Sequence, residues 1–171
     1  MTPELTVFRT RLGWFGLAGS DGTVSRLLIG HASADEVRAR AVPLLADGWR
    51  EARWWPELQQ RLIDYASGRP DDFRDVRIAQ SRRTTFQRRV IRELRKIGYG
   101  RTISYGELAE LAGAPRAARA VGTTMKQNHA PLIVPCHRVI ASGGKLGGYS
   151  APQGLSLKQR LLELEGARPR R

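Results

Sequence analysis

The nonapeptide LIVPCHRVI, residues 132–140, carries the clearest chemical signal in this chain. Its aliphatic start predicts a buried segment that leads directly into Pro135, Cys136, His137 and Arg138. A thiol becomes a useful nucleophile only as thiolate, and a neighbouring base or positive charge lowers its pKa. His137 and Arg138 place both beside Cys136, and Pro135 fixes the local backbone. The segment therefore predicts a nucleophilic cysteine.

An inert, buried Cys136 is the alternative, because a lone cysteine is commonly part of the core. Adjacent side chains tend to point apart, so His137 is expected to reach the sulfur through one water molecule. Cys136 is the only cysteine of the chain, which excludes an internal disulfide and a Cys-rich zinc site. We predict no structural metal, because no metal-ligand spacing links the three histidines, His31, His129 and His137.

Upstream of the nonapeptide, a helix is expected after residue 84. Thr84 and Gln87 stand at capping-box spacing. Apolar residues then recur at helical spacing and share one face: Phe86, Val90, Leu94 and Ile97. Gly98 and Gly100 are expected to end this helix.

The next two helices are a helix-turn-helix candidate. Ser104 and Glu107 form a second capping box, and Gly113 supplies a C-terminal stop. Another helix is predicted over residues 116–126, opened by Pro115. Two short helices joined by a glycine-containing turn are typical of a helix-turn-helix.

The distribution of charge points to a polyanionic partner. The net charge is +13, and 29 basic residues stand against 16 acidic ones. Residues 1–83 hold 13 basic and 11 acidic residues, whereas residues 84–171 hold 16 and 5. A genome-wide arginine bias is the alternative, but it does not explain this asymmetry. If nucleic acid is bound, the second half is expected to bind it.

Residues 117–122 surround Arg119 with small side chains, among them Ala118. Small residues let a helix approach a partner closely, with one long charged group projecting. Together with the charge asymmetry, this favours contact with DNA. Ordinary packing of an amphipathic helix through its alanines is the alternative.

The first 83 residues predict a small α+β unit without visible chemistry. Strands are expected over residues 5–9, 14–18, 24–29 and 73–78. Helices are expected from Ser33, with Glu36 at capping-box spacing, and from Pro56 to Gly68. The second helix has an apolar face of Leu58, Leu62 and Tyr65.

The fold class is therefore α+β, in two domains. Residues 1–83 are expected to form a small α/β domain, an antiparallel sheet with helices. A polar linker, residues 79–84, leads to a mostly helical C-terminal domain, residues 84–171, with the helix-turn-helix. That domain continues with a Gly-rich loop over 142–148, a helix carrying Leu157, Leu161, Leu162 and Leu164, and a frayed tail from Ala167.

Location follows from what the sequence lacks. No apolar run approaches the length that spans a bilayer. The segment Met1 to Arg11 has no apolar block of the kind found in signal peptides. The chain is therefore expected to stay in the cytoplasm.

Several blocks together resemble the O6-alkylguanine-DNA alkyltransferase family. Residues 133–140 are similar to the active-site motif of that family. Further matching blocks follow in the family's order between about residues 85 and 166: 103–106, 117–122, Asn128, Pro131, 148–150 and 161–166. The resemblance implies a suicide DNA-repair protein that moves an alkyl group from O6-alkylguanine onto its own Cys136. Double-stranded DNA is the implied partner, with no cofactor and a monomeric chain.

The resemblance also implies catalytic roles. Cys136 is the acceptor, His137 the base acting through a water, and Glu165 the group that orients and charge-balances His137. Tyr105 donates a proton to the guanine ring as the base leaves. Without the resemblance, Glu165 would be interpreted as a solvated residue at a helix end, and Tyr105 as a packing residue.

Binding roles follow from the same resemblance. Backbone groups at Cys136, Val139 and Ser150 read the guanine edge, while a pocket is shaped by Met125, Pro131 and Tyr149. Asn128 ties the recognition helix to the active-site segment. Since the alkylated base must leave the duplex, Arg119 is expected to enter the stack in its place, with Ala118 in the minor groove.

One departure and two rival functions stay open. Residues 151–154 read Ala-Pro-Gln-Gly where the family commonly has glycines, which predicts a stiffer loop and a narrower pocket. A non-catalytic sensor of alkylated bases is the first rival, although the related group of sensors has tryptophan in place of Cys136. A cysteine hydrolase that uses Cys136 and His137 is the second, and it leaves the basic second half unexplained.

Overall fold

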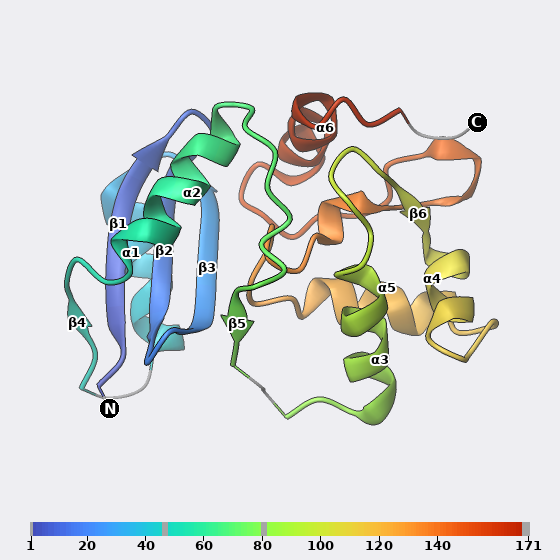
Figure 1. Ribbon diagram of the computed structural model, residues 1–171, viewed down its shortest axis with the longest axis horizontal. Coiled ribbons are helices and arrows are strands. Elements are labelled where there is room, and N and C mark those ends of the chain that lie inside the picture. Colours follow the sequence, from blue (N-terminus) through green and yellow to red (C-terminus); the bar gives the residue numbers. More distant parts are fainter. Residues whose placement is uncertain (1, 46–47, 80–81, 169–171) are drawn as a thin grey trace.

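Three antiparallel strands form the centre of the larger sheet in the computed structural model, which describes residues 2–45, 48–79 and 82–168 (Figure 1). They are β1 (Glu4–Thr10), β2 (Gly13–Ser20) and β3 (Thr23–His31). Two short edge strands, β4 (Arg50–Glu51) and β5 (Arg77–Ile78), pair in parallel with β1 and β3. The strand order is β4-β1-β2-β3-β5, so the sheet is mostly antiparallel.

Helices cover both faces of this sheet. Because successive strand side chains point to opposite faces, Phe15 and Leu17 lie on one face and Ala18 on the other. Helix α2 (Pro56–Ala66) packs on the first face, where its Leu58 and Leu62 are buried. Helix α1 (Ala34–Ala41) covers the second face through Ala41 and continues into a 3-10 turn, Val42–Leu44.

The two halves of the chain share a core. Leu132 and Ile133, a few residues before Cys136, belong to the same apolar cluster as the strand residues of the sheet. So do Leu157 and Leu161 of helix α6 (Gly154–Leu164). The backbone N–H of Leu27 also donates to the carbonyl of His129 at 2.8 Å. The segment that leads to Cys136 is therefore held by the N-terminal sheet as well as by its own half.

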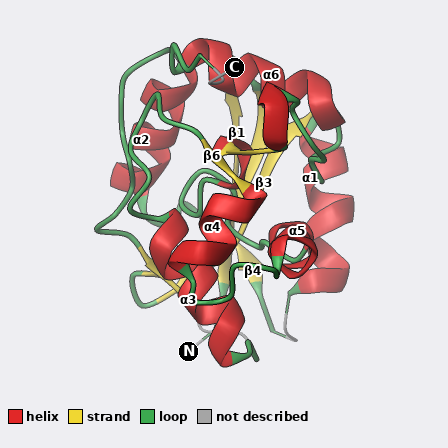
Figure 2. Ribbon diagram, turned by 90° about the vertical axis from the view of Figure 1, so that its right-hand side faces the viewer, coloured by secondary structure: helices red, strands yellow, loops and turns green. Residues whose placement is uncertain are grey.

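Three helices enclose a second apolar cluster: α3 (Thr85–Leu94), α4 (Tyr105–Leu111) and α5 (Ala118–Lys126). Figure 2 shows these helices in front, with the strands of the large sheet behind them. A small parallel pair consists of β6 (Ile103–Ser104) and β7 (Val139–Ile140). It joins the start of α4 to the two residues that follow Arg138. The cysteine itself begins a 3-10 turn, Cys136–Arg138, and another 3-10 turn spans Ser142–Gly144.

The local predictions that rest on caps and periodicity are confirmed. Capping boxes form at Thr84 with Gln87 and at Ser104 with Glu107, in both directions. The three strands, the helix from Pro56 and the final leucine-bearing helix lie where the pattern placed them. At Ser33 the box is only half formed, because Glu36 accepts from the backbone of Ala32 and not from that of Ser33.

Three predicted boundaries are wrong. The expected strand over 73–78 shortens to residues 77–78, because Phe73 has a φ of +48° in a turn. The carbonyls of residues 73, 74 and 76 in that turn accept from Arg95. Helix α3 ends at Leu94, before Gly98 and Gly100. Helix α5 begins at residue 118, two residues later than predicted, because residues 115 and 116 form a turn. In this turn the backbone N–H of residue 117 donates to the carbonyl of Ala114.

Two predictions fall partly outside the described residues. They are the expected linker, at residues 80–81, and the expected frayed tail, at residues 169–171. Within the described ranges, no helix is both long enough and apolar enough to cross a membrane.

Candidate active site

A strained turn presents the cysteine. Leu132 is buried with a φ of +71°, a conformation that costs a non-glycine residue about 1–2 kcal/mol. Pro131 and Val134 form a parallel bridge across this turn, and the N–H of Cys136 donates to the carbonyl of Val134 at 2.7 Å. The side chain of Cys136 is 8% exposed and lines a cavity of about 1110 Å³. The sulfur is therefore held in place and still reachable from a cavity.

Asn128 connects the end of helix α5 to this turn. Its Oδ1 accepts from the N–H of Ala130 at 3.0 Å, and its Nδ2 donates to the carbonyl of Val134 at 2.9 Å. The same Nδ2 lies 3.1 Å from the Cys136 sulfur. Movement of α5 and placement of the sulfur are thus coupled through one amide group.

Arg138 is not the cation that acts on the sulfur, contrary to the expectation from its position in the sequence. Its guanidinium points to Glu165 and Asp72 instead. Burial raises the pKa of the Cys136 thiol, while the Asn128 amide and the charge of Lys158 oppose that rise. The resting sulfur is therefore a thiol, and its proton has to leave during the reaction.

Lys158 supplies the positive charge near the sulfur. This lysine is fully buried on α6, and its Nζ donates to the carbonyls of Val139 at 2.6 Å and Gly148 at 3.2 Å. Burial lowers the pKa of Lys158 to about 8, although the charge of Cys136 opposes this. Sequence reasoning missed Lys158. The signal was its spacing, because it lies two helical turns before Glu165 on an otherwise apolar face.

His137, the residue after Cys136, is fully buried, and its Nε2 lies 2.8 Å from Oε1 of Glu165. A carboxylate only accepts, so Nε2 carries the proton and Nδ1 offers a lone pair. Nδ1 is buried and has no hydrogen-bond partner among the described residues. Burial lowers the pKa of His137, although Glu165 opposes this, so the ring is neutral at neutral pH.

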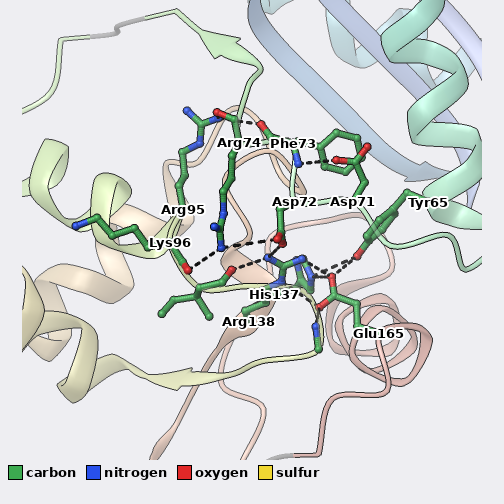
Figure 3. Close-up of polar contacts among 12 residues, drawn as sticks. Tyr65, Asp71, Asp72, Phe73, Arg74, Arg95, Lys96, His137, Arg138 and Glu165 are labelled. Atoms are coloured by element: carbon green, nitrogen blue, oxygen red, sulfur yellow. Dashed lines mark hydrogen bonds and ion pairs between the residues drawn. The ribbon is translucent and has the colours of Figure 1, made fainter.

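Glu165 is the centre of a dense polar network (Figure 3). Oε1 accepts from Tyr65 at 2.6 Å, from His137 and from Arg138, while Oε2 accepts from Arg138 at 3.0 Å and from the N–H of Gly100 at 3.1 Å. Burial alone would raise the pKa of Glu165, but His137 and Arg138 lower it well below its usual value. Glu165 is a permanent carboxylate, and it is buried rather than solvated.

Six of the expected site residues line the same cavity as the sulfur: Tyr105, Met125, Asn128, Pro131, Tyr149 and Ser150. Tyr105 comes close to the loop at Gly147, where a Cβ would lie 2.8 Å from the Tyr105 hydroxyl. Gly147 also has a φ of +73°, so this close approach depends on glycine. The Tyr149 hydroxyl is buried, and burial together with Cys136 raises its pKa well above the usual value.

Five expected residues lie apart from the cavity wall, and two of them are the buried pair His137 and Glu165 described above. Val139 is fully buried, and its carbonyl accepts from Lys158. Ala118 and Arg119 form the first turn of α5, and Arg119 is exposed. Their roles toward DNA therefore stay predictions.

The loop that departs from the family pattern is anchored to the N-terminal half. Gln153 donates to the carbonyl of Gly30 at 2.9 Å, and its Oε1 accepts from Arg160. Ala151 and Pro152 form part of the cavity wall. The same cavity extends past this loop to residues of β3 and α1, so its volume does not measure the width beside Cys136, and the narrower pocket stays a prediction.

Comparisons with known proteins place this site in a family. A family model described as the DNA-binding domain of 6-O-methylguanine DNA methyltransferase matches residues 85–167. A methylated-DNA–protein-cysteine methyltransferase of Mycolicibacterium paratuberculosis is 41% identical over 155 residues, which cover 90% of this chain and 87% of the relative. The chain belongs to the methylated-DNA–protein-cysteine methyltransferase family. Since Cys136 is the only cysteine, it is the only side chain here that can be the acceptor cysteine of this family.

Solved structures extend the match over the whole methyltransferase chain. A Mycobacterium tuberculosis OGT in complex with DNA has a TM-score of 0.78 and 35% identity, covering 95% of this chain and 92% of that one. The O6-methylguanine-DNA methyltransferase of Pyrococcus kodakaraensis has a TM-score of 0.74 and 27% identity, covering 97% and 100%. The resemblance read from residues 85–166 is thereby confirmed, and it includes the first 83 residues.

Proposed function

We propose that this chain repairs DNA by direct reversal, moving the methyl or alkyl group of O6-alkylguanine onto the sulfur of Cys136. One observation carries the proposal: the single cysteine lines a large cavity, and the next residue in the chain is a buried histidine paired with a glutamate. The bond from O6 to the alkyl carbon breaks as the sulfur–carbon bond forms. The product is a thioether, and the sequence holds no second thiol to reverse it, so each chain acts once.

His137 is the base in this proposal. Its Nδ1 takes the proton of the Cys136 thiol through one water molecule as the sulfur attacks. Glu165 holds the opposite ring nitrogen, so the imidazole keeps the tautomer with a free Nδ1. The raised pKa of the buried thiol makes such a base necessary.

The leaving guanine needs a proton, and Tyr105 on the cavity wall is the proposed donor to the guanine ring. Met125, Pro131 and Tyr149 would then enclose the base, with backbone groups of Cys136, Val139 and Ser150 reading its edge. Lys158 stabilises the negative charge that develops on the sulfur, since its own charge lowers the thiol pKa.

Lys158→Gln is expected to lower the rate of methyl transfer on the order of tenfold, because glutamine can still donate a hydrogen bond but carries no charge. In the wild type the rate should rise as His137 loses its proton and fall as Lys158 loses its proton near pH 8. The alkaline fall should be absent in the variant. Single-turnover rates between pH 6 and 10 measure this, with Lys145→Gln as the control, because Lys145 is an exposed lysine in the loop before α6. An unchanged alkaline limb in Lys158→Gln contradicts the role.

DNA binding is proposed to use α4 and α5 as a helix-turn-helix, with α5 in the minor groove and residues 84–171 as the DNA-binding and transfer domain. Residues 1–83 form the second domain. The alkylated nucleotide has to rotate out of the duplex, which costs a few kcal/mol. Arg119, exposed at the start of α5, would fill the vacated place in the stack, while Ala118 allows close approach.

Arg119→Ala is expected to slow repair of methylated duplex by on the order of tenfold and to leave the reaction with free O6-methylguanine nearly unchanged, because a free base needs no extrusion. Arg69→Ala removes another exposed arginine, from the N-terminal half, and serves as the control. Rates on both substrates measure the difference. Equal losses on duplex and free base would count against the stacking role.

The chain is further proposed to act as a monomer in the cytoplasm, with double-stranded DNA as its partner and without a cofactor. Sedimentation of the free chain, and of the chain on a short duplex, tests the monomer.

Intact mass after incubation with methylated duplex tests the proposed function. A gain of one methyl group supports transfer. Tight binding of methylated duplex with an unchanged mass supports the rival sensor, and hydrolysis of ester or amide substrates supports the rival hydrolase.

A further inference from the structure

Tyr65 brings the N-terminal half into the active-site network. It lies on α2, one hundred residues before Glu165, and its side chain is 1% exposed. Its hydroxyl oxygen lies 2.6 Å from Oε1 of Glu165 and 3.4 Å from Nε2 of His137. Figure 3 shows the ring entering from the N-terminal side with its hydroxyl directed at both groups. The rings of Phe73 and Tyr99, at 5.7 and 5.9 Å, hold the tyrosine ring on its sides.

The direction of this hydrogen bond follows from the partners. Nε2 of His137 carries the proton that it donates to Glu165, so it offers no lone pair to the tyrosine. The Tyr65 proton therefore goes to the carboxylate. Burial and the neighbouring Glu165 both raise the pKa of Tyr65 well above its usual value, which keeps the hydroxyl protonated and donating.

We propose that Tyr65 is a positioning residue for the transfer reaction: its hydroxyl holds the Glu165 carboxylate and limits its basicity, so that Glu165 orients His137 while the ring stays neutral with a free Nδ1. This inference rests on the function proposed above. It gives the N-terminal half, in which the sequence shows no chemistry, a direct part in the reaction.

The physical effect is on the basicity of the carboxylate. Each donor on Oε1 spreads part of its negative charge, and Tyr65 is the closest of the three, at 2.6 Å. Removing that donor leaves a more basic carboxylate, which favours a protonated imidazole. The pKa of His137 then rises, and a larger fraction of the base is occupied by a proton at a given pH.

The other groups that face His137 bear on the same titration. Helix α6 contributes Glu165 and Lys158, and the 3-10 turn contributes Arg138. Tyr99 and Asp72 act one step further away, through Glu165 and Arg138. All of these stay in place when only the hydroxyl of residue 65 is removed, so a change in the His137 titration can be assigned to that hydroxyl.

Tyr65→Phe is the test. We expect the rate of methyl transfer from methylated duplex at neutral pH to fall on the order of tenfold, with the midpoint of the acid limb shifted to higher pH. Affinity for methylated duplex should stay unchanged, because residue 65 is buried away from any surface. Tyr99→Phe is the matched control, since it removes a hydroxyl at the same corner that donates to the Leu164 carbonyl and not to Glu165. Its acid midpoint should shift much less than that of Tyr65→Phe.

Replacing Tyr65 by 3,5-difluorotyrosine covers the case in which phenylalanine unfolds the chain. Fluorine makes the hydroxyl a stronger donor, so the acid midpoint should shift to lower pH. The inference is overturned if the wild type transfers methyl groups and both replacements leave the midpoint unchanged, or if Tyr99→Phe shifts it equally. A wild type that takes up no methyl group overturns the proposed function instead, and the two failures are thereby distinguished.

Discussion

A Cys136→Ala chain should bind methylated duplex and gain no mass from it. The substitution removes the only thiol of the chain, so no sulfur remains to form a thioether. The remaining cavity wall is unchanged, and phosphate contacts supply most of the affinity for DNA. We therefore expect transfer to disappear completely while duplex affinity stays close to that of the wild type. Intact mass and a binding titration on the same duplex measure the two effects separately.

Cys136→Ser is the matched variant, because its hydroxyl can still accept from Asn128 but is a far weaker nucleophile. It should also bind without gaining mass. A methyl group found on the alanine variant would show that another residue is the acceptor and would remove the basis of the proposed chemistry.

Glu165→Gln should damage both stability and transfer. An amide has one oxygen and one NH₂ group, so at least one carboxylate position becomes a donor that faces other donors. The buried guanidinium of Arg138 then loses the more buried of its two counter-charges and keeps only Asp72, and breaking a buried ion pair typically costs about 3–5 kcal/mol of the free energy of unfolding. For a chain of this size that corresponds to a fall in Tm of roughly 10 °C. Transfer should fall at least about a hundredfold, because His137 loses its orientation.

Glu163→Gln is the control, since it is the same substitution on an exposed residue at the end of the same helix. Thermal unfolding of both variants against pH adds a second check. The lowered pKa of Glu165 stabilises the folded chain above the unfolded value of roughly 4.3, and this stabilisation is lost as pH falls further. The Tm difference between the wild type and Glu165→Gln should therefore be largest near neutral pH and shrink in acid. A constant difference would contradict the account of this carboxylate.

Local signals in the sequence predict much of the fold. Each capping box, at Thr84 and at Ser104, joins two residues that are only three positions apart in the chain. It can therefore be recognised without knowing the tertiary structure. The predicted strand over 73–78 is wrong because its structure depends on a contact that is distant in the sequence. The backbone carbonyls of this segment accept hydrogen bonds from Arg95, about twenty residues later, and no local pattern indicates that contact.

The candidate site divides in the same way. Cys136 and His137 can be found because they are adjacent in the sequence, and Glu165 because the family motif includes it. Tyr65 was assigned only to an apolar face, since its partners lie seventy or more residues away. Arg138 was given the wrong partner, because adjacency in sequence does not fix the direction of a side chain. In the structure it turns to Glu165 and Asp72, and Lys158 takes the place beside the sulfur.

One measurement decides whether each chain accepts a single methyl group on Cys136. It is the stoichiometry of methyl uptake in excess methylated duplex, with the methyl group located by fragmentation of the protein. We expect a plateau at one methyl group per chain, all of it on the Cys136 sulfur, with guanine restored in an equal amount of DNA. Continued turnover beyond one group per chain, or a methyl group on any other residue, would contradict it.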